Sequence, residues 1–176
     1  KECIFDGFFV AFYSSSQMEE SKLYLNMILA DDEPVDIVKR AIDSVKEYVD
    51  GMYIAVTYKE TEPTEESELV KFLKSYNVNI FYFKWVQDFA AARQFILDQT
   101  PHGEKTYIFW LDADDVVQNA HRIRELFNLA IPQQWGAVFL RYYYMVDLDE
   151  RGRVREILVE HKRERIIRND DSFKWV

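Results

Sequence analysis

Three closely spaced aspartates, Asp112, Asp114 and Asp115, are the residues whose types and spacing most clearly suggest chemistry. They follow the apolar run TYIFWL of residues 106–111, which is typical of a buried strand. Their carboxylates repel one another, and the flanking sequence offers no Lys or Arg within five residues on either side. Mg²⁺ and Mn²⁺ prefer hard oxygen ligands, so the pattern predicts a divalent-metal site that serves a phosphorylated substrate. The alternative is an exposed loop in which Asp115 caps the following helix.

The elements that must position these aspartates alternate short strands with amphipathic helices. Apolar runs predict buried strands at 24–30, 53–57, 78–83 and 106–111. Apolar residues at helical spacing follow the strands, and the expected N-caps of the first three helices are Asp36, Thr64 and Asp88. A fourth helix is predicted around 123–127. This order predicts a single α/β domain, Rossmann-like, with a mostly parallel sheet flanked by helices on both faces.

From Gly136 onward the pattern changes to two long strands. Residues 136–146 and 153–159 predict an antiparallel hairpin with its turn at 147–152. Because an open parallel sheet binds ligands beyond the carboxyl ends of its strands, we expect the aspartates at a ligand-binding edge. The surplus of Lys and Arg in residues 151–168 is interpreted either as a solvated hairpin face or as help in holding a diphosphate or an anionic acceptor.

Composition and charge exclude several classes of protein. A chain of 176 residues that is 48% hydrophobic and 16% aromatic is not disordered, and a net charge of −9 disfavours a broad nucleic-acid-binding surface. The longest apolar run, residues 8–13, falls far short of the roughly 20 residues that span a bilayer. The start at Lys1 does not resemble a signal peptide, and the single Cys3 fits a reducing compartment. We therefore expect a cytoplasmic protein without a membrane span or a nucleic-acid partner.

Two segments together resemble the family 2 glycosyltransferases. Segment 84–94, KWVQDFAAARQ, is similar to that family's Trp-x-x-Asp-Phe-(Ser/Ala)-x-Ala-Arg-Asn stretch, and segment 110–115, WLDADD, is similar to its Asp-x-Asp motif after the fourth strand. Their order and spacing also match, and the resemblance covers roughly residues 23–170. It implies a glycosyltransferase A-type fold that binds a nucleotide-diphospho-sugar, and the donor that it favours is a UDP-sugar. It also implies inverting transfer of the sugar to a glycan, lipid or protein acceptor.

The resemblance implies a nucleotide site outside the aspartate cluster as well. The base would be bordered by the turn made of Ala30, Asp31, Asp32 and Glu33. Asp88 and Arg93 would help to hold the base, the ribose or the phosphates. Plainer interpretations stay open, with Asp88 as a helix N-cap and Arg93 as an ion-pair partner of a carboxylate. Trp85 and Phe89 are expected in the core rather than on a substrate-binding surface.

For the aspartates themselves, the resemblance implies a division of roles. Asp112 and Ala113 would contact the nucleotide sugar, with Asp112 facing the ribose or a metal-bound water. Asp114, joined by Asp112 and Asp115, would bind the Mg²⁺ or Mn²⁺ that bridges the two phosphates. A bridging cation acts as a Lewis acid on the departing nucleoside diphosphate, which is the chemistry such a transfer requires.

The sequence departs from the family at the base-binding positions. The second strand usually ends in an Asp that touches the base, whereas Thr57 and its neighbours stand there in this chain. The usual Asn-Glu after the first strand is replaced by Asp-Asp-Glu-Pro at residues 31–34. Both departures weaken the assignment of the base as uracil.

No catalytic base is assigned from the sequence. In relatives with a stretch like ERIIRN of residues 164–169, an acidic residue follows shortly afterwards, often after a His, whereas this chain ends at Val176. We therefore expect 1–22 to be an N-terminal extension without an assigned role. Residues 23–176 are expected to form a nucleotide-sugar-binding domain that lacks its C-terminal part and belongs with further domains.

The aspartates also invite two other interpretations, and a third is excluded. Residues 108–116 satisfy the haloacid-dehalogenase phosphatase pattern, with Asp112 as nucleophile and Asp114 as general acid/base, although that motif belongs on an early strand. A glycosyltransferase-like module that binds without turnover is the non-enzymatic alternative. An EF-hand does not fit, because its sixth position would be Val117 rather than Gly and its twelfth Ile123 rather than Glu.

Overall fold

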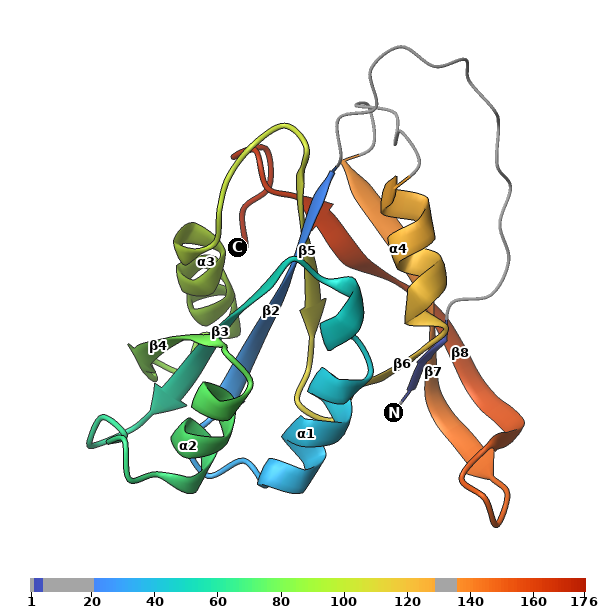
Figure 1. Cartoon of the computed structure of the whole chain (residues 1–176), viewed down its shortest axis with the longest axis horizontal. Coiled ribbons are helices and arrows are strands. Elements are labelled where there is room, and N and C mark those ends of the chain that lie inside the picture. The colour runs from blue at the N-terminus through green and yellow to red at the C-terminus, as the bar shows by residue number, and fades with distance from the viewer. Residues whose placement is uncertain (1, 5–20, 129–135) are drawn as a thin grey trace.

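The computed structural model describes residues 2–4, 21–128 and 136–176. Its strands form one sheet in the order β4-β3-β2-β5-β8-β7-β1-β6 (Figure 1). The strands are β1 (Glu2–Ile4), β2 (Lys22–Ala30), β3 (Gly51–Tyr58), β4 (Asn79–Lys84), β5 (Thr106–Leu111), β6 (Val116–Gln118), β7 (Ala137–Leu148) and β8 (Val154–Arg168). The helices are α1 (Val35–Asp43), the 3-10 turn η1 (Lys46–Tyr48), α2 (Glu68–Ser75), α3 (Phe89–Gln99) and α4 (Ala120–Asn128).

The predicted fold class is confirmed. Strands β2 to β5 are parallel, and each pair of consecutive strands among them is joined through a helix on one of the two faces. Strand β8 then runs antiparallel to β5 and forms the expected hairpin with β7. The turn end of this hairpin extends away from the body of the molecule (Figure 1). Strand β1 adds to this half of the sheet, antiparallel to β7 and parallel to β6.

The central strands bury both of their faces. On β2, residues 23, 25, 27 and 29 join the main core with side chains of α1, α2 and α4. Alternate residues of β2 and β5 point to the opposite face, which α3 covers together with Trp175. Because no face is left to solvent, the strand sequences read as continuous apolar runs instead of alternating with polar residues.

Two of the three predicted N-caps are wrong. Helix α1 has Pro34 at its N-cap position, and Asp36 lies in the first turn, where its charge still suits the positive helix end. Helix α2 begins at Glu68 after Ser67, whereas the Thr64 hydroxyl accepts a hydrogen bond from the Glu66 N–H in the preceding turn. Asp88 is confirmed as the N-cap of α3.

Strand β8 contains a β-bulge at Arg165. Val138 pairs with Ile166, but its neighbour Phe139 pairs with Glu164, so Arg165 is an extra residue in the ladder. Such a bulge locally changes the direction in which side chains point, and bulges often lie beside functional sites. The Arg165 side chain reaches β5 and the loop that follows it.

Within the parts of the chain that the structure describes, no helix combines the length and apolar character required to cross a membrane.

Candidate functional site

The register of the sheet places the aspartates beside the end of β2. Leu111, the last residue of β5, pairs with Met27, three residues before the end of β2 at Ala30. Strand β5 therefore ends before β2 does. Residues 112–115, here called the aspartate turn, follow β5 directly and lie beside the end of β2. The carboxyl ends of β2, β3, β4 and β5 meet at this edge, where an open parallel sheet binds its ligands.

The aspartate turn is closed by two reciprocal hydrogen bonds. The Asp115 N–H donates to the Asp112 carbonyl oxygen at 3.1 Å, and the Asp112 N–H donates to Asp115 Oδ2 at 3.0 Å. The Asp115 side chain is fully buried, whereas Asp114 at the tip of the turn is exposed. The turn thus places the Asp115 carboxylate in the protein interior and the Asp114 carboxylate at the surface. Helix α4 begins later, at Ala120, so Asp115 does not cap it.

Asp115 forms a buried ion pair with Arg165. Nη2 of Arg165 lies 3.0 Å from Asp115 Oδ2, and the two side chains are 2% and 0% exposed. The guanidinium lies over the rings of Trp110 and Tyr142, at 4.0 and 4.8 Å from their centroids. The local sequence contains no cation near the aspartates, but the fold brings one to them from β8.

Burial and charge shift the titration of the groups around this pair. Burial raises the pKa of Asp115, and the positive charge of Arg165 opposes that rise. Burial also raises the pKa of the Tyr142 phenol, and the nearby negative charge of Asp115 adds to the effect. At neutral pH the tyrosine is therefore a neutral neighbour of the ion pair.

Asp112 lies between two arginines. Arg93 Nη2 on α3 is 3.3 Å from Asp112 Oδ1, and Arg165 Nη2 is 3.7 Å from Oδ2. The Arg93 guanidinium lies 4.4 and 5.0 Å from the ring centroids of Trp110 and Trp175, which pack edge-on against each other at 5.4 Å. The Asp112 side chain remains 44% exposed, so it is oriented from both sides yet accessible to a ligand.

The charge of Asp114 acts on the acidic turn that follows β2. Burial raises the pKa of Glu33, and the negative charges of Asp32 and Asp114 raise it further. The turn is fixed by backbone bonds, since the Glu33 N–H donates to the Ala30 carbonyl at 3.1 Å. The aspartate turn and the turn of residues 30–33 therefore lie at one edge, as the sequence predicted from the order of the strands.

Thr57, which replaces the family's base-contacting Asp, belongs to the sheet. Its hydroxyl donates to the Leu29 carbonyl at 3.3 Å and it is buried, and its own carbonyl accepts the Asp31 N–H at 3.0 Å. It holds the turn of residues 30–33 in place and offers no exposed carboxylate there.

Asp88 serves as a helix cap. One of its carboxylate oxygens accepts hydrogen bonds from the Ala90 and Ala91 N–H groups at 2.9 and 3.1 Å. The expectation that Phe89 lies in the core is wrong, because the residue is 64% exposed while its ring packs edge-on against Trp85. The start of α3 therefore presents an aromatic surface to solvent.

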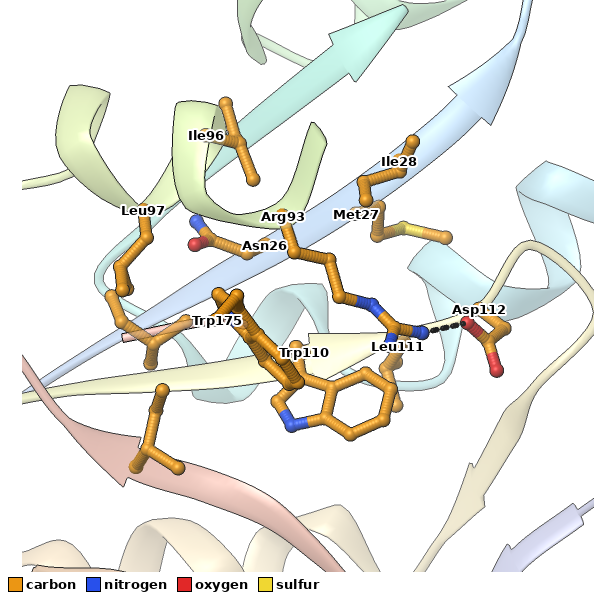
Figure 2. Close-up of a pocket in the computed structure, with 12 residues that line it drawn as sticks. Asn26, Met27, Ile28, Arg93, Ile96, Leu97, Trp110, Leu111, Asp112 and Trp175 are labelled. Atoms are coloured by element: carbon orange, nitrogen blue, oxygen red, sulfur yellow. Dashed lines mark hydrogen bonds and ion pairs between the residues drawn. The ribbon is translucent and has the colours of Figure 1, made fainter. Parts of the chain in front are cut away.

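A small pocket lies between α3 and the sheet, behind Asp112. Figure 2 shows Arg93 reaching from α3 past Trp110 and Trp175 toward Asp112. The room inside is about 20 Å³, enough for about one water molecule. In this conformation the pocket does not admit a nucleoside, so the open strand-end edge beside it is the candidate binding surface.

Comparison with solved structures shows a shared fold. The chain is similar to 4-diphosphocytidyl-2C-methyl-D-erythritol synthase from Anaerococcus prevotii, with a TM-score of 0.54 and 11% identity over 89% of this chain and 73% of that one. Two structures of S. aureus TarS also match, one of them in complex with UDP-GlcNAc. Their TM-scores are 0.38 and 0.34, each at 14% identity, covering 59% and 53% of this chain and 29% and 16% of theirs. No family model and no curated protein sequence matches the chain.

The donor set suits a metal that is held jointly with a ligand. Among the residues that the structure describes, no group of three or more His, Cys, Asp or Glu side chains is arranged to bind a metal ion. Mg²⁺ is commonly held by one or two carboxylates together with substrate phosphates, and exposed Asp114 beside Glu33 fits that pattern. Buried Asp115, already paired with Arg165, fits it poorly despite the sequence-based expectation.

Sequence reasoning missed the side chains that hold the aspartates. Arg165, Trp110 and Trp175 were not assigned roles, although all three contact Arg93, Asp112 or each other. One available signal was the position of Arg165 directly before the buried pair Ile166 and Ile167, since a charge inside a buried strand needs a partner.

Proposed function

We propose that this chain is the nucleotide-sugar-binding part of a metal-dependent, inverting glycosyltransferase that uses a UDP-sugar. The observation that carries the proposal is the division of the aspartate turn. Asp112 and Asp115 are paired with arginines and Asp115 is buried, and Asp114 is exposed at the tip of the turn, where its charge acts on Glu33. The resemblance of segments 84–94 and 110–115 to family 2 glycosyltransferases supports the same conclusion.

The geometry suggests a distinct part for each carboxylate. Two arginines lower the affinity of Asp112 for a cation but leave its oxygens able to accept hydrogen bonds, so Asp112 suits the hydroxyl groups of a ribose. Asp114 and the diphosphate together would hold Mg²⁺ or Mn²⁺. Asp31, Asp32 and Glu33 would border the nucleoside, and Arg93 would act on the donor by orienting Asp112.

The reaction we propose transfers the sugar in one displacement. The acceptor hydroxyl oxygen attacks the anomeric carbon, the bond from that carbon to the phosphate oxygen breaks, and the nucleoside diphosphate leaves with the electron pair. When bound, the divalent cation supplies Lewis-acid stabilisation of the leaving phosphate. The residues of this chain bind and orient the donor at the strand-end edge, and the hydroxyl proton passes to a base that we do not assign.

A nucleotide panel tests the donor class. We expect UDP, in the presence of Mn²⁺, to raise the unfolding temperature more than ADP, CDP or GDP, because a ligand that binds the native state stabilises it. Absence of any shift with all four nucleotides and Mn²⁺ would refute the proposal. If beryllofluoride with Mg²⁺ stabilises the chain and UDP does not, the phosphatase alternative replaces it.

Turnover separates an enzyme from a binding module. The proposal predicts slow, Mn²⁺-dependent release of UDP from a UDP-sugar, with water as the acceptor, by the full chain. Release of UDP would exclude the non-catalytic alternative, whereas binding without release is expected both of that module and of a donor-binding part that lacks the catalytic base.

A further inference from the structure

Arg165 is the most deeply buried cation at the site. It is 2% exposed, stands in the bulge of β8, and has aromatic rings of Trp110 and Tyr142 within 4.0 and 4.8 Å of its guanidinium carbon. Its Nε and Nη1 atoms are buried and make no hydrogen bond. The side chain therefore directs Nη2, and Nη2 alone among its nitrogens, to hydrogen-bonding or ion-pairing partners.

The partners of that nitrogen are the two ends of the aspartate turn. Nη2 lies 3.0 Å from Asp115 Oδ2 and 3.7 Å from Asp112 Oδ2. The same Asp115 oxygen accepts the Asp112 N–H at 3.0 Å. Arg165 thus constrains Asp112 twice, through the Asp112 carboxylate directly and through its backbone by way of Asp115.

We infer that Arg165 is a positioning residue that fixes the Asp112 carboxylate for the nucleotide sugar, an inference that rests on the proposed function. Arg165 does not touch the donor. Its planar guanidinium, which lies over the Trp110 ring, links the bulge of β8 to the aspartate turn and holds Asp112 from one side, while Arg93 holds it from α3. Partners that orient the ligands of a metal commonly change metal affinity or activity by about 10- to 100-fold when they are altered, and we expect an effect of that order on donor binding here.

The competing account is that Arg165 only neutralises buried Asp115. Removal of Arg165 alone cannot decide between them, because an unpaired buried carboxylate would destabilise the fold under either account. The double variant Asp115→Asn/Arg165→Met removes both charges, and the amide oxygen introduced at position 115 can still accept the Asp112 N–H. It therefore keeps the turn closed and charge-balanced while removing the contact with the Asp112 carboxylate.

Titration calorimetry with UDP and Mn²⁺ tests the inference on the full chain. We expect the folded double variant to bind UDP at least about tenfold more weakly than wild type. Arg165→Lys keeps a positive charge opposite Asp115 but lacks the planar group that lies over the rings of Trp110 and Tyr142, and we expect about a tenfold loss there too. Arg163→Met removes a cation from the same strand whose side chain is exposed, and it should bind as wild type does.

The outcomes separate this inference from the proposed function. If wild type binds UDP with Mn²⁺ and either folded Arg165 variant binds within about twofold of wild type, Arg165 is a counter-charge only and the inference is overturned. An equal loss in Arg163→Met would overturn it as well, because the effect would then follow the net charge of the strand. If wild type itself does not bind, the proposed function fails, and this inference fails with it.

Discussion

At the scale of single residues, the site depends on two opposite charges that are buried as an ion pair. Arg165 and Asp115 are both almost completely buried, and their attraction must offset the loss of hydration of two ions. Such a pair adds little stability compared with apolar residues of similar size, but each partner is costly to remove alone. This asymmetry is what makes the pair testable.

Arg165→Met should lower the free energy of unfolding by about 3–5 kcal/mol, because it leaves Asp115 buried without a counter-charge. The double variant Asp115→Asn/Arg165→Met should recover most of that loss. Urea unfolding of the three proteins measures both quantities. Equal stabilities for the single and double variants would contradict the ion pair.

The residues that the sequence identified are those with local signals. The aspartates and Arg93 stand in segments whose spacing resembles a family, and the structure brings them to one edge. Arg165 was not identified because it lies far from Asp115 along the chain, and only the placement of β8 beside β5 brings it near. No local pattern reports such a contact.

At the scale of elements, the N-terminal part of helix α3 contributes both to the stability of the helix and to the site. Its cap, Asp88, satisfies two N–H groups, and Arg93 one turn later reaches the site. An N-cap substitution can therefore affect ligand binding through the helix without any contact with the ligand. A variant that keeps the cap distinguishes these possibilities.

For α3 we predict that Asp88→Ala lowers the free energy of unfolding by about 1 kcal/mol, whereas Asp88→Ser is close to wild type, since serine also caps helices. UDP affinity with Mn²⁺ should be retained in Asp88→Ser. If this serine variant is stable but has lost UDP binding, Asp88 contacts the nucleotide directly, as the family resemblance implied.

The end of α1 carries an ionic cluster with a clear pH signature. Burial opposes ionisation of Asp43, but hydrogen bonds from Lys39, Lys46 and the Tyr76 hydroxyl outweigh it and lower the pKa of Asp43 to about 2. An unfolded aspartate titrates near about 3.9. Because the folded pKa is the lower one, the stabilisation is complete above about pH 4 and disappears as the pH falls through about 2.

We accordingly predict that Asp43→Asn is less stable than wild type at pH 6 and that the difference shrinks between about pH 4 and 2. Thermal unfolding across this range measures it, with Asp36→Asn as the matched control on the same helix. A stability difference for Asp43→Asn that is constant over the whole range would contradict the assignment.

Element boundaries were harder to predict than element types. The four parallel strands and their helices were expected, but α1 and α2 do not start at Asp36 and Thr64. Pro34, with its fixed φ near −61°, opens α1, and Thr64 instead stabilises a turn. Several polar residues near each helix start are capable caps, and tertiary packing selects among them.

At the scale of the whole molecule, one core links the parallel strands to the hairpin. It contains side chains from β2, β3 and β5 together with Leu140, Tyr142 and Ile166 of β7 and β8. Strand β8, which carries Arg165, is therefore built on the same core as β5, which leads into the aspartate turn. The sequence predicted the parallel half from its β-α alternation, but it did not show where the hairpin would join, because that depends on pairing between distant segments.

A core substitution tests whether the parallel strands and the hairpin unfold together. Leu25 is fully buried at the centre of β2, so Leu25→Ala should lower the free energy of unfolding by about 2–5 kcal/mol. Circular dichroism and tryptophan fluorescence should report one coincident transition in wild type and variant alike. Separate transitions would show that the hairpin and the parallel strands unfold independently.

The central claim is that the strand-end edge binds a nucleoside diphosphate through a metal held by Asp114. Titration calorimetry with UDP, with and without Mn²⁺, on wild type and Asp114→Ala tests it most directly, and Glu150→Ala in the hairpin turn is the charge-matched control. We predict Mn²⁺-dependent UDP binding by wild type and Glu150→Ala, and its loss in Asp114→Ala. Equal UDP binding by Asp114→Ala and wild type, or no binding by wild type with Mn²⁺ present, would contradict the account.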